Sequence, residues 1–201
     1  MKCFALAFAV ALSLSACGKH EAILPDASSP GGGNEIEREA SGFSLIHPIA
    51  SPVQNLTSND GKIHISIKGS HFQSITPDPE DLPRGLTPED ITLLQYDANS
   101  DIMLYITQIG QAKTDAKTYF NKLKMALTQA QAEHNIQNLT IGISTDNRMN
   151  YRFAQTDKTG NTLQEYCIAL HSSYVYDICA NSRKAEPIKL AAVLKDIQLS
   201  K

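Results

Sequence analysis

Apolar and polar residues alternate along several short segments of the chain, which is the pattern of half-buried β-strands. The clearest is residues 62–68, where isoleucine occupies every second position. Turn residues such as Asn59-Asp60-Gly61 separate neighbouring segments, so we expect antiparallel pairs. The predicted strands are 42–48, 62–68, 70–75, 91–97, 102–109, 139–143, 149–153, 163–170 and 174–180, with 197–199 extended at the end.

Two segments have the helical period of apolar residues instead. After Thr114 and Asp115, which can cap a helix, apolar residues recur at steps of three and four up to about Glu133. This stripe consists of Ala116, Phe120, Leu123, Leu127 and Ala130. A second helix is predicted for 185–195, with Pro187 in its first turn. The pattern therefore predicts an α+β fold: a central antiparallel β-sheet, formed as a meander, flanked by an amphipathic helix and a C-terminal helix.

Residues 76–89 interrupt both patterns, because they contain four prolines and a glycine, and we expect a loop there. Asp78, Glu80 and Asp81 in this loop could attract calcium. They lack the regular ligand spacing of a dedicated cation loop, so no metal site is predicted.

The first 16 residues have the pattern of a secretory signal: Lys2, an apolar run over 4–14, and two small residues. The run has eleven residues, whereas a helix needs about 20 to span a bilayer. Leu14-Ser15-Ala16-Cys17 also resembles the lipobox of bacterial lipoproteins. This resemblance implies that Cys17 is lipidated, that the chain is cut before it, and that the new amino group is acylated.

Residues 18–41 are rich in proline, glycine and polar residues, which predicts a flexible tether. The expected organisation is therefore a signal peptide over 1–16, a lipidated tether over 17–41 and a single domain over 42–201. Gly18 stands where an aspartate would retain an enterobacterial lipoprotein in the inner membrane. We therefore expect an outer-membrane lipoprotein that faces either the periplasm or the cell surface.

Composition and charge narrow the classes of function. A chain with 42% hydrophobic and 19% charged residues is of ordinary globular composition. The formal charge of −3 and the lack of a basic block argue against a nucleic-acid partner. The sequence contains no G-x-S-x-G, H-E-x-x-H, P-loop or G-x-G-x-x-G motif, so we predict a protein that is not an enzyme, with no catalytic residues and no cofactor.

The four cysteines differ in their expected fates. Cys3 is lost with the signal and Cys17 carries lipid, which leaves Cys167 and Cys179 in an oxidising compartment. If strands 163–170 and 174–180 pair symmetrically about Ser173, these two cysteines lie opposite each other, with Cα atoms about 4.5 Å apart. We therefore predict a disulfide between them. A redox-active pair would need a closer C-x-x-C spacing.

The symmetric register also separates the two faces of this hairpin. One face, assigned to the core, consists of Tyr166, Ile168, Leu170, Tyr176, Ile178 and Ala180. Both cysteines are expected on the other face. Elsewhere, His64 and His71 fall on or beside one strand pair and could ligate zinc together with an acidic residue. The sequence does not identify a third ligand.

The order of elements resembles the PsbP-like fold, in which a central antiparallel sheet lies between helices. The resemblance rests on Gly42-Phe43-Ser44-Leu45 and on the strand pattern of 151–180, and it covers about 42–200. This α/β/α sandwich is shared by photosystem accessory proteins and small bacterial lipoproteins of the DcrB type. The resemblance implies a non-catalytic accessory module that docks on another envelope protein.

Two other functions stay open from the sequence. One is a small-ligand or metal-binding lipoprotein of the envelope that uses His64, His71 and the 76–89 loop. The other is an envelope hydrolase whose catalytic residues are dispersed along the chain.

Overall fold

The computed structural model describes residues 52–76, 87–156 and 160–200. The predicted signal, lipidation site, tether and strand at 42–48 lie outside these ranges, as does most of the 76–89 loop. In chain order the elements are β1 (Val53–Thr57), β2 (Ile63–Lys68), β3 (Gln73–Ser74), the 3-10 turn η2 (Pro88–Asp90), β4 (Ile91–Asp97), β5 (Ile102–Gln111), α1 (Ala116–Ala132), β6 (Gln137–Thr145), β7 (Arg148–Thr156), β8 (Thr162–His171), β9 (Tyr174–Ser182), α2 (Pro187–Val193) and β10 (Asp196–Leu199).

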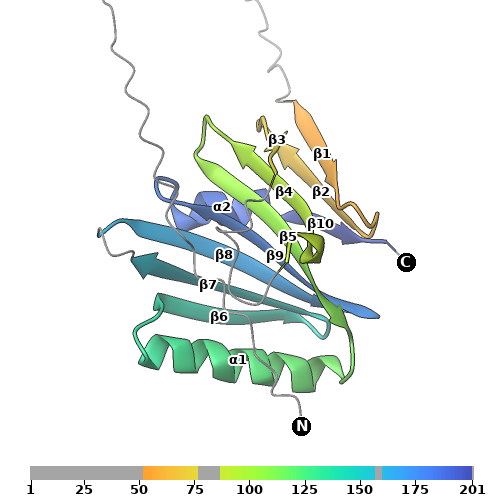
Figure 1. The fold of residues 1–201 in the computed structure, drawn as a ribbon, viewed down its shortest axis with the longest axis vertical. Helices are drawn as coiled ribbons and strands as arrows, with labels where there is room; N and C mark the ends of the chain where they lie inside the picture. Colours follow the sequence, from red (N-terminus) through yellow and green to blue (C-terminus); the bar gives the residue numbers. More distant parts are fainter. Residues whose placement is uncertain (1–51, 77–86, 157–159, 201) are drawn as a thin grey trace, which may run out of the picture.

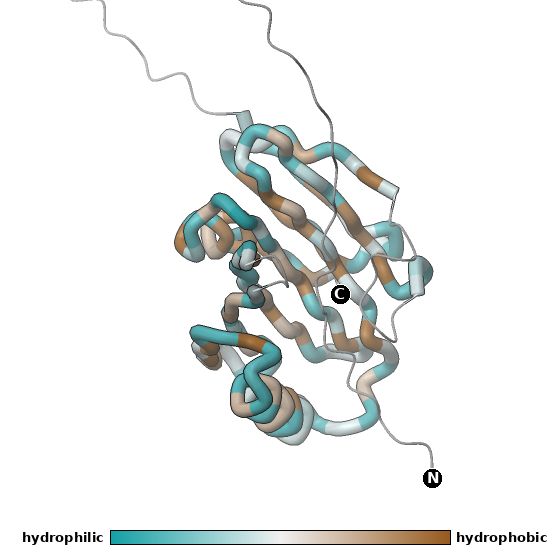
Figure 2. Tube along the Cα trace, turned by 60° about the vertical axis from the view of Figure 1, so that its left-hand side comes forward, coloured by the Kyte–Doolittle hydropathy of each residue, from teal (hydrophilic) through white to brown (hydrophobic). Residues whose placement is uncertain are grey.

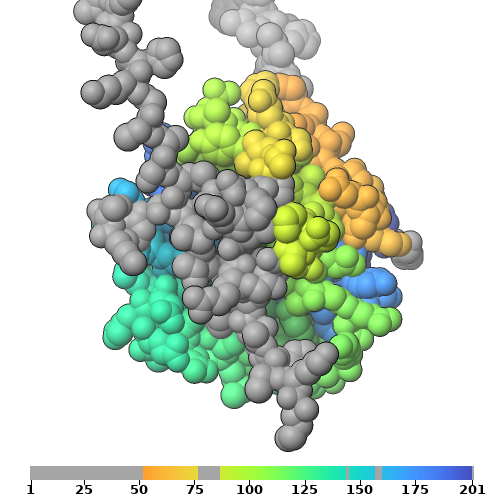
Figure 3. Space-filling model, in the orientation of Figure 1, coloured from red at the N-terminus to blue at the C-terminus, as the bar shows by residue number. Residues whose placement is uncertain are grey.

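The strands form two antiparallel sheets. The larger has the order β3-β4-β5-β9-β8-β7-β6, and the smaller has the order β1-β2-β10. Helix α1 lies beside the β6 end of the large sheet, and the small sheet lies towards its β3–β4 end (Figure 1). In the space-filling view from the same side, the β1–β2 hairpin and the α1–β6 segment occupy different edges of the domain (Figure 3). The predicted α+β class and the meander from β6 to β9 are confirmed.

Hydrophobic and hydrophilic residues alternate along the strands (Figure 2). Their buried side chains form two hydrophobic cores, one on each face of the large sheet. The first core lies between the large sheet, the small sheet and α2. Its fully buried side chains include Ile63, Ile65, Leu104, Ile106, Ile168, Tyr176, Ile178, Leu190 and Leu194. Since these residues come from both ends of the chain and its middle, this core holds the β1–β2 hairpin, α2 and β10 in one domain.

The second core lies under α1. The helix begins after Asp115, whose side chain accepts a hydrogen bond from the Thr118 amide at 2.9 Å and so caps the first turn. The predicted stripe is buried at Phe120, Leu123, Leu127 and Ala130, while Ala116 is half-buried. No helix in the described residues has both the length and the apolar character needed to span a membrane.

The small sheet is the main feature that the sequence did not predict. Strand β2 pairs with β1 on one side and with the C-terminal β10 on the other, so these strands form a layer of their own. Strand β1 was not predicted, and α2 is shorter than the expected helix over 185–195. The hairpin of β4 and β5 has the predicted bounds on its first strand, with Tyr96 opposite Met103 and Asp97 opposite Ile102.

A polar contact joins the two sheets at the predicted turn after β1. Gly61 adopts φ of 69°, a left-handed conformation that glycine takes without steric cost. The preceding Asp60 accepts hydrogen bonds from Ser58 Oγ at 2.5 Å and from Tyr176 Oη at 2.7 Å. Because Tyr176 is on β9, this carboxylate fixes the position of the hairpin on the large sheet.

Candidate functional site: a buried acid and tyrosine cluster beside the disulfide

The β8–β9 hairpin has the register expected from its sequence. Cys167 lies opposite Cys179 and Ile168 opposite Ile178. The two cysteines form a disulfide with their Cα atoms 4.2 Å apart, which confirms the predicted bridge. Short antiparallel pairs of this kind bring the two sulfur atoms within bonding reach without a change in the backbone.

Both faces of this hairpin are buried. The face of Ile168 and Ile178 belongs to the first core, as expected. The cysteine face belongs to the second core, where α1 covers it, and each cysteine is only 1% exposed. The sequence assignment treated only one face as core, because alternation within a hairpin does not reveal what an amphipathic helix elsewhere in the chain will cover.

Two carboxylic acids lie on the cysteine face, and each accepts a hydrogen bond from a tyrosine. Tyr105 of β5 donates to Oε1 of Glu165 on β8. Tyr151 of β7 donates to Oδ2 of Asp177 on β9 at 2.5 Å. Glu165 is 3% exposed, and its Oε1 lies 3.5 Å from the Cys167 sulfur. Four neighbouring strands thus place two acids and two phenols next to the disulfide.

Burial changes the proton affinity of this cluster. It raises the pKa of Glu165 to about 7; the hydrogen bond from Tyr105 opposes this rise, and the charge of Asp177 adds to it. Burial also raises the pKa of Asp177 to about 6, against the effect of the hydrogen bond from Tyr151. Oδ1 of Asp177 is buried and makes no hydrogen bond within the described residues. A buried oxygen without a donor favours the protonated acid.

Burial and the nearby acids also raise the pKa of both Tyr105 and Tyr151 well above its ordinary value. The phenols therefore remain hydrogen-bond donors at every physiological pH. The arrangement can take up and release protons at the two acids. One hollow of the surface is lined by Asn138 and its neighbours, and another is lined by Pro52 and its neighbours. None of the four side chains of the cluster lines either hollow.

The cluster does not provide a metal site in its oxidised form. Ligand atoms of Glu165, Cys167 and Cys179 lie within 4.8 Å of one another, which is a spacing that could surround an ion. Both sulfurs are joined in the disulfide, however, and a cysteine binds zinc as a thiolate.

His64 and His71, which were considered as zinc ligands from the sequence, have different surroundings in the structure. His64 is on β2, where its Nδ1 lies 3.0 Å from Thr57 Oγ1 and its Nε2 lies 2.8 Å from Ser200 Oγ. His71 is exposed and lines the shallow hollow at Pro52. Across the part of the chain with described coordinates, no group of three potential metal ligands includes either histidine. The loop acids Asp78, Glu80 and Asp81 lie outside the described residues.

The raised pKa of Glu165 predicts that the domain loses stability as the pH rises. The ordinary pKa of this carboxyl is 4.5, so between about pH 5 and 7 the folded chain binds a proton that the unfolded chain releases. We expect the free energy of unfolding to fall by on the order of 3 kcal/mol between about pH 5 and pH 8 from this group. Denaturant unfolding at a series of pH values measures this slope.

Glu165→Gln removes the titration and keeps an acceptor for Tyr105. The variant should be more stable than the parent at about pH 8 and should have a flatter pH profile. Glu186→Gln, at an exposed acid before α2, is the matched control and should leave the slope unchanged. A parent profile that rises from pH 5 to 8, or an equal slope in Glu165→Gln, would contradict the prediction.

Sequence reasoning missed this cluster because its members come from four strands. Glu165 and Asp177 each lie two residues from a cysteine, so the alternation of the strands places them on the cysteine face. This spacing was the signal of the cluster that the sequence contained. That signal would have mattered only if the apolar stripe of α1 had been assigned to the same face.

Comparison with known proteins adds little beyond the fold. No family model matches the chain, and no curated protein matches it. Among solved structures it is similar to cyanobacterial PsbP (CyanoP) from Synechocystis sp. PCC 6803, with a TM-score of 0.45 and 10% sequence identity. The alignment covers 80% of this chain and 99% of that chain. The structural neighbour is thus a PsbP-like protein, and a similarity at this level says nothing about what this chain binds.

Proposed function

We propose that this protein is a lipid-anchored lipoprotein of the outer membrane whose domain is a non-catalytic module that binds another envelope protein. The observation that carries the proposal is Leu14-Ser15-Ala16-Cys17 after a short apolar run. Lipidation and cleavage of a lipoprotein signal need a thiol at the cleavage position and small residues before it. Cys17 meets the first condition, and Ser15 and Ala16 meet the second.

The segment after Cys17 supports a domain that stands away from the lipid surface. About 24 residues of flexible chain have a root-mean-square reach of about 25 to 30 Å. A tether of this length lets the domain bind a partner while its acyl chains remain in the bilayer.

The outer edge of the large sheet supports a protein partner. Within the described strands, β6 pairs only with β7, so one side of its backbone is left without a neighbouring strand. Strand β6 has no charged residue and no proline, and its Ile143 is 67% exposed. Charges and prolines are two of the ways in which proteins protect edge strands, and an edge without them is a place where an extended segment of a partner can add a strand.

Site-specific crosslinking in intact cells tests the proposal. A photoreactive residue at Ile143 should capture a distinct envelope protein, and mass spectrometry of the adduct identifies it. The matched control is Met125, which is 72% exposed and is on α1 instead of on a strand edge. Recovery of the monomer alone from both positions, in repeated experiments, would count against a partner.

Fractionation of cells tests the location separately. The protein should sediment with outer membranes, and protease added to whole cells distinguishes the cell surface from the periplasmic face. Sedimentation with inner membranes would overturn the proposed location without bearing on the anchor itself.

A further inference from the structure

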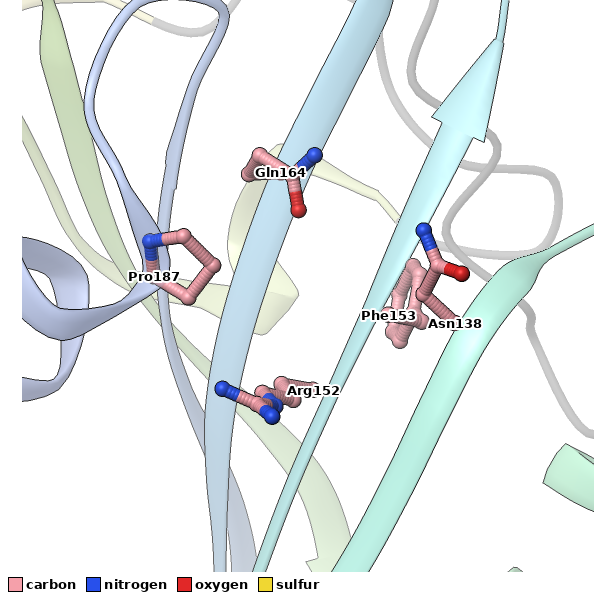
Figure 4. Close-up of a pocket in the computed structure, with 5 residues that line it drawn as sticks. All are labelled: Asn138, Arg152, Phe153, Gln164 and Pro187. Carbon is pink, nitrogen blue, oxygen red and sulfur yellow. The ribbon is translucent and has the colours of Figure 1, made fainter.

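Three polar side chains that have no partner among the described residues line one hollow of the surface. The hollow is about 270 Å³ and is lined by Asn138, Arg152, Phe153, Gln164 and Pro187. Figure 4 shows these residues around the opening, contributed by β6, β7, β8 and the start of α2. Pro187 supplies an apolar wall, whereas the Phe153 side chain is packed in the second core and is only 6% exposed. The guanidinium and the two carboxamides supply hydrogen-bond donors.

The Arg152 guanidinium makes no ion pair or hydrogen bond with any residue of the described ranges. The same is true of the Asn138 and Gln164 carboxamides. By contrast, Arg148, four residues earlier on the same face of β7, donates from Nε to Asn150 Oδ1 at 3.0 Å. The side chains at the hollow are therefore available to a ligand, whereas a similar arginine on the same strand is engaged.

Within the described strands β6, β7 and β8, the sheet face around the hollow has no acidic residue. Thr140 and Tyr166 lie opposite Arg152 on the two neighbouring strands, and Gln164 lies opposite Ala154. None of these is acidic, so no carboxylate of β6, β7 or β8 competes for the arginine on this face. The exposed Glu186 precedes Pro187 in the chain but does not line the hollow.

We propose that this hollow binds the carboxylate group of a small organic acid or of a peptide terminus. A guanidinium can donate two parallel hydrogen bonds to a carboxylate, and the two amide groups can donate to its remaining lone pairs. One cation in the lining matches one negative charge. The apolar wall at Pro187 suits an aliphatic group next to the carboxylate. This inference is independent of the lipid anchor and of the β6 edge.

Nuclear magnetic resonance titration of the purified mature chain tests the site. The probes are N-acetyl-leucine, hexanoate, a short peptide with a free C-terminus, inorganic phosphate, and N-acetyl-leucinamide, which lacks the charge. The side-chain N–H signals of Asn138, Arg152 and Gln164 should shift saturably with the acids and not with the amide. Tighter binding of the peptide assigns the site to a chain end, and tighter binding of hexanoate assigns it to a free acid.

Two arginine variants provide the matched comparison. Arg152→Gln should weaken binding of the acids about tenfold or more, because it removes a charge-assisted pair of hydrogen bonds. Arg148→Gln, on the same face of the same strand, should change it less than about twofold. Thermal unfolding of both variants checks that each remains folded. The proposal fails if no acid binds saturably, if the amide or inorganic phosphate binds as tightly as the acids, or if both variants lose binding equally.

Discussion

Once residues 1–16 have been removed, a Cys17→Ser chain should be found in the soluble fraction and not in the membrane fraction, because serine has no thiol to carry the lipid. The parent carries two or three acyl chains in our proposal, and each buried CH₂ group contributes about 0.8 kcal/mol to membrane affinity. One chain of myristoyl length holds a protein only marginally, whereas two or more hold it stably. We therefore expect the parent to resist extraction by salt and high pH and to be released by detergent.

The sequence provides a matched control for this change. Cys3 is in the predicted signal, so Cys3→Ser should leave the mature protein anchored. Fractionation of both variants, followed by detection of the domain in each fraction, measures the effect. A Cys17→Ser chain that still sediments with membranes after the signal has been removed would show that something other than lipid on this sulfur holds it there.

Removal of the Cys167–Cys179 disulfide should lower the stability of the domain by about 3 kcal/mol. The bridge closes a short loop, with a sequence separation of 12, and so restricts the unfolded chain. For a chain of this size, about 3 kcal/mol corresponds to a fall in Tm of about 6 to 12 °C. The double variant Cys167→Ala/Cys179→Ala avoids leaving a single reactive thiol in the second core, and thermal unfolding measures its Tm.

Unfolding in a reducing agent distinguishes the effect of losing the disulfide from the effect of the substitutions on core packing. The parent should lose most of the same stability when it is unfolded in the presence of a thiol reductant, while the double variant should not respond to the reductant. The denatured, unreduced parent should have no titratable thiols at positions 167 and 179. Two free thiols there, or equal Tm values for parent and double variant, would contradict a stabilising bridge.

Local features could be predicted well from the sequence. The β8–β9 register follows from a short turn with Ser173 at its centre, so the pairing of Cys167 and Cys179 needed no knowledge of the rest of the fold. Helix α1 was likewise predicted, because its cap at Asp115 and its apolar stripe are both encoded within one segment. In both cases the interacting residues are close in the chain.

Long-range arrangement was the part that could not be predicted. Strand β10 pairs with β2, with Ile197 opposite Ile65, and nothing local to either strand specifies the other. The burial of Glu165 and of Oδ1 of Asp177 depends on α1 covering a face of β8 and β9 that alternation alone does not mark as core. The hollow at Arg152 likewise requires β6, β7, β8 and α2 to be placed together.

Mass spectrometry of the amino-terminal fragment of the mature protein tests the central claim most directly. The account predicts that the chain begins at Cys17 and that this residue carries the added mass of a diacylglycerol group on sulfur and an acyl group on nitrogen. An unmodified Cys17, or a mature chain that begins at another residue, would contradict it.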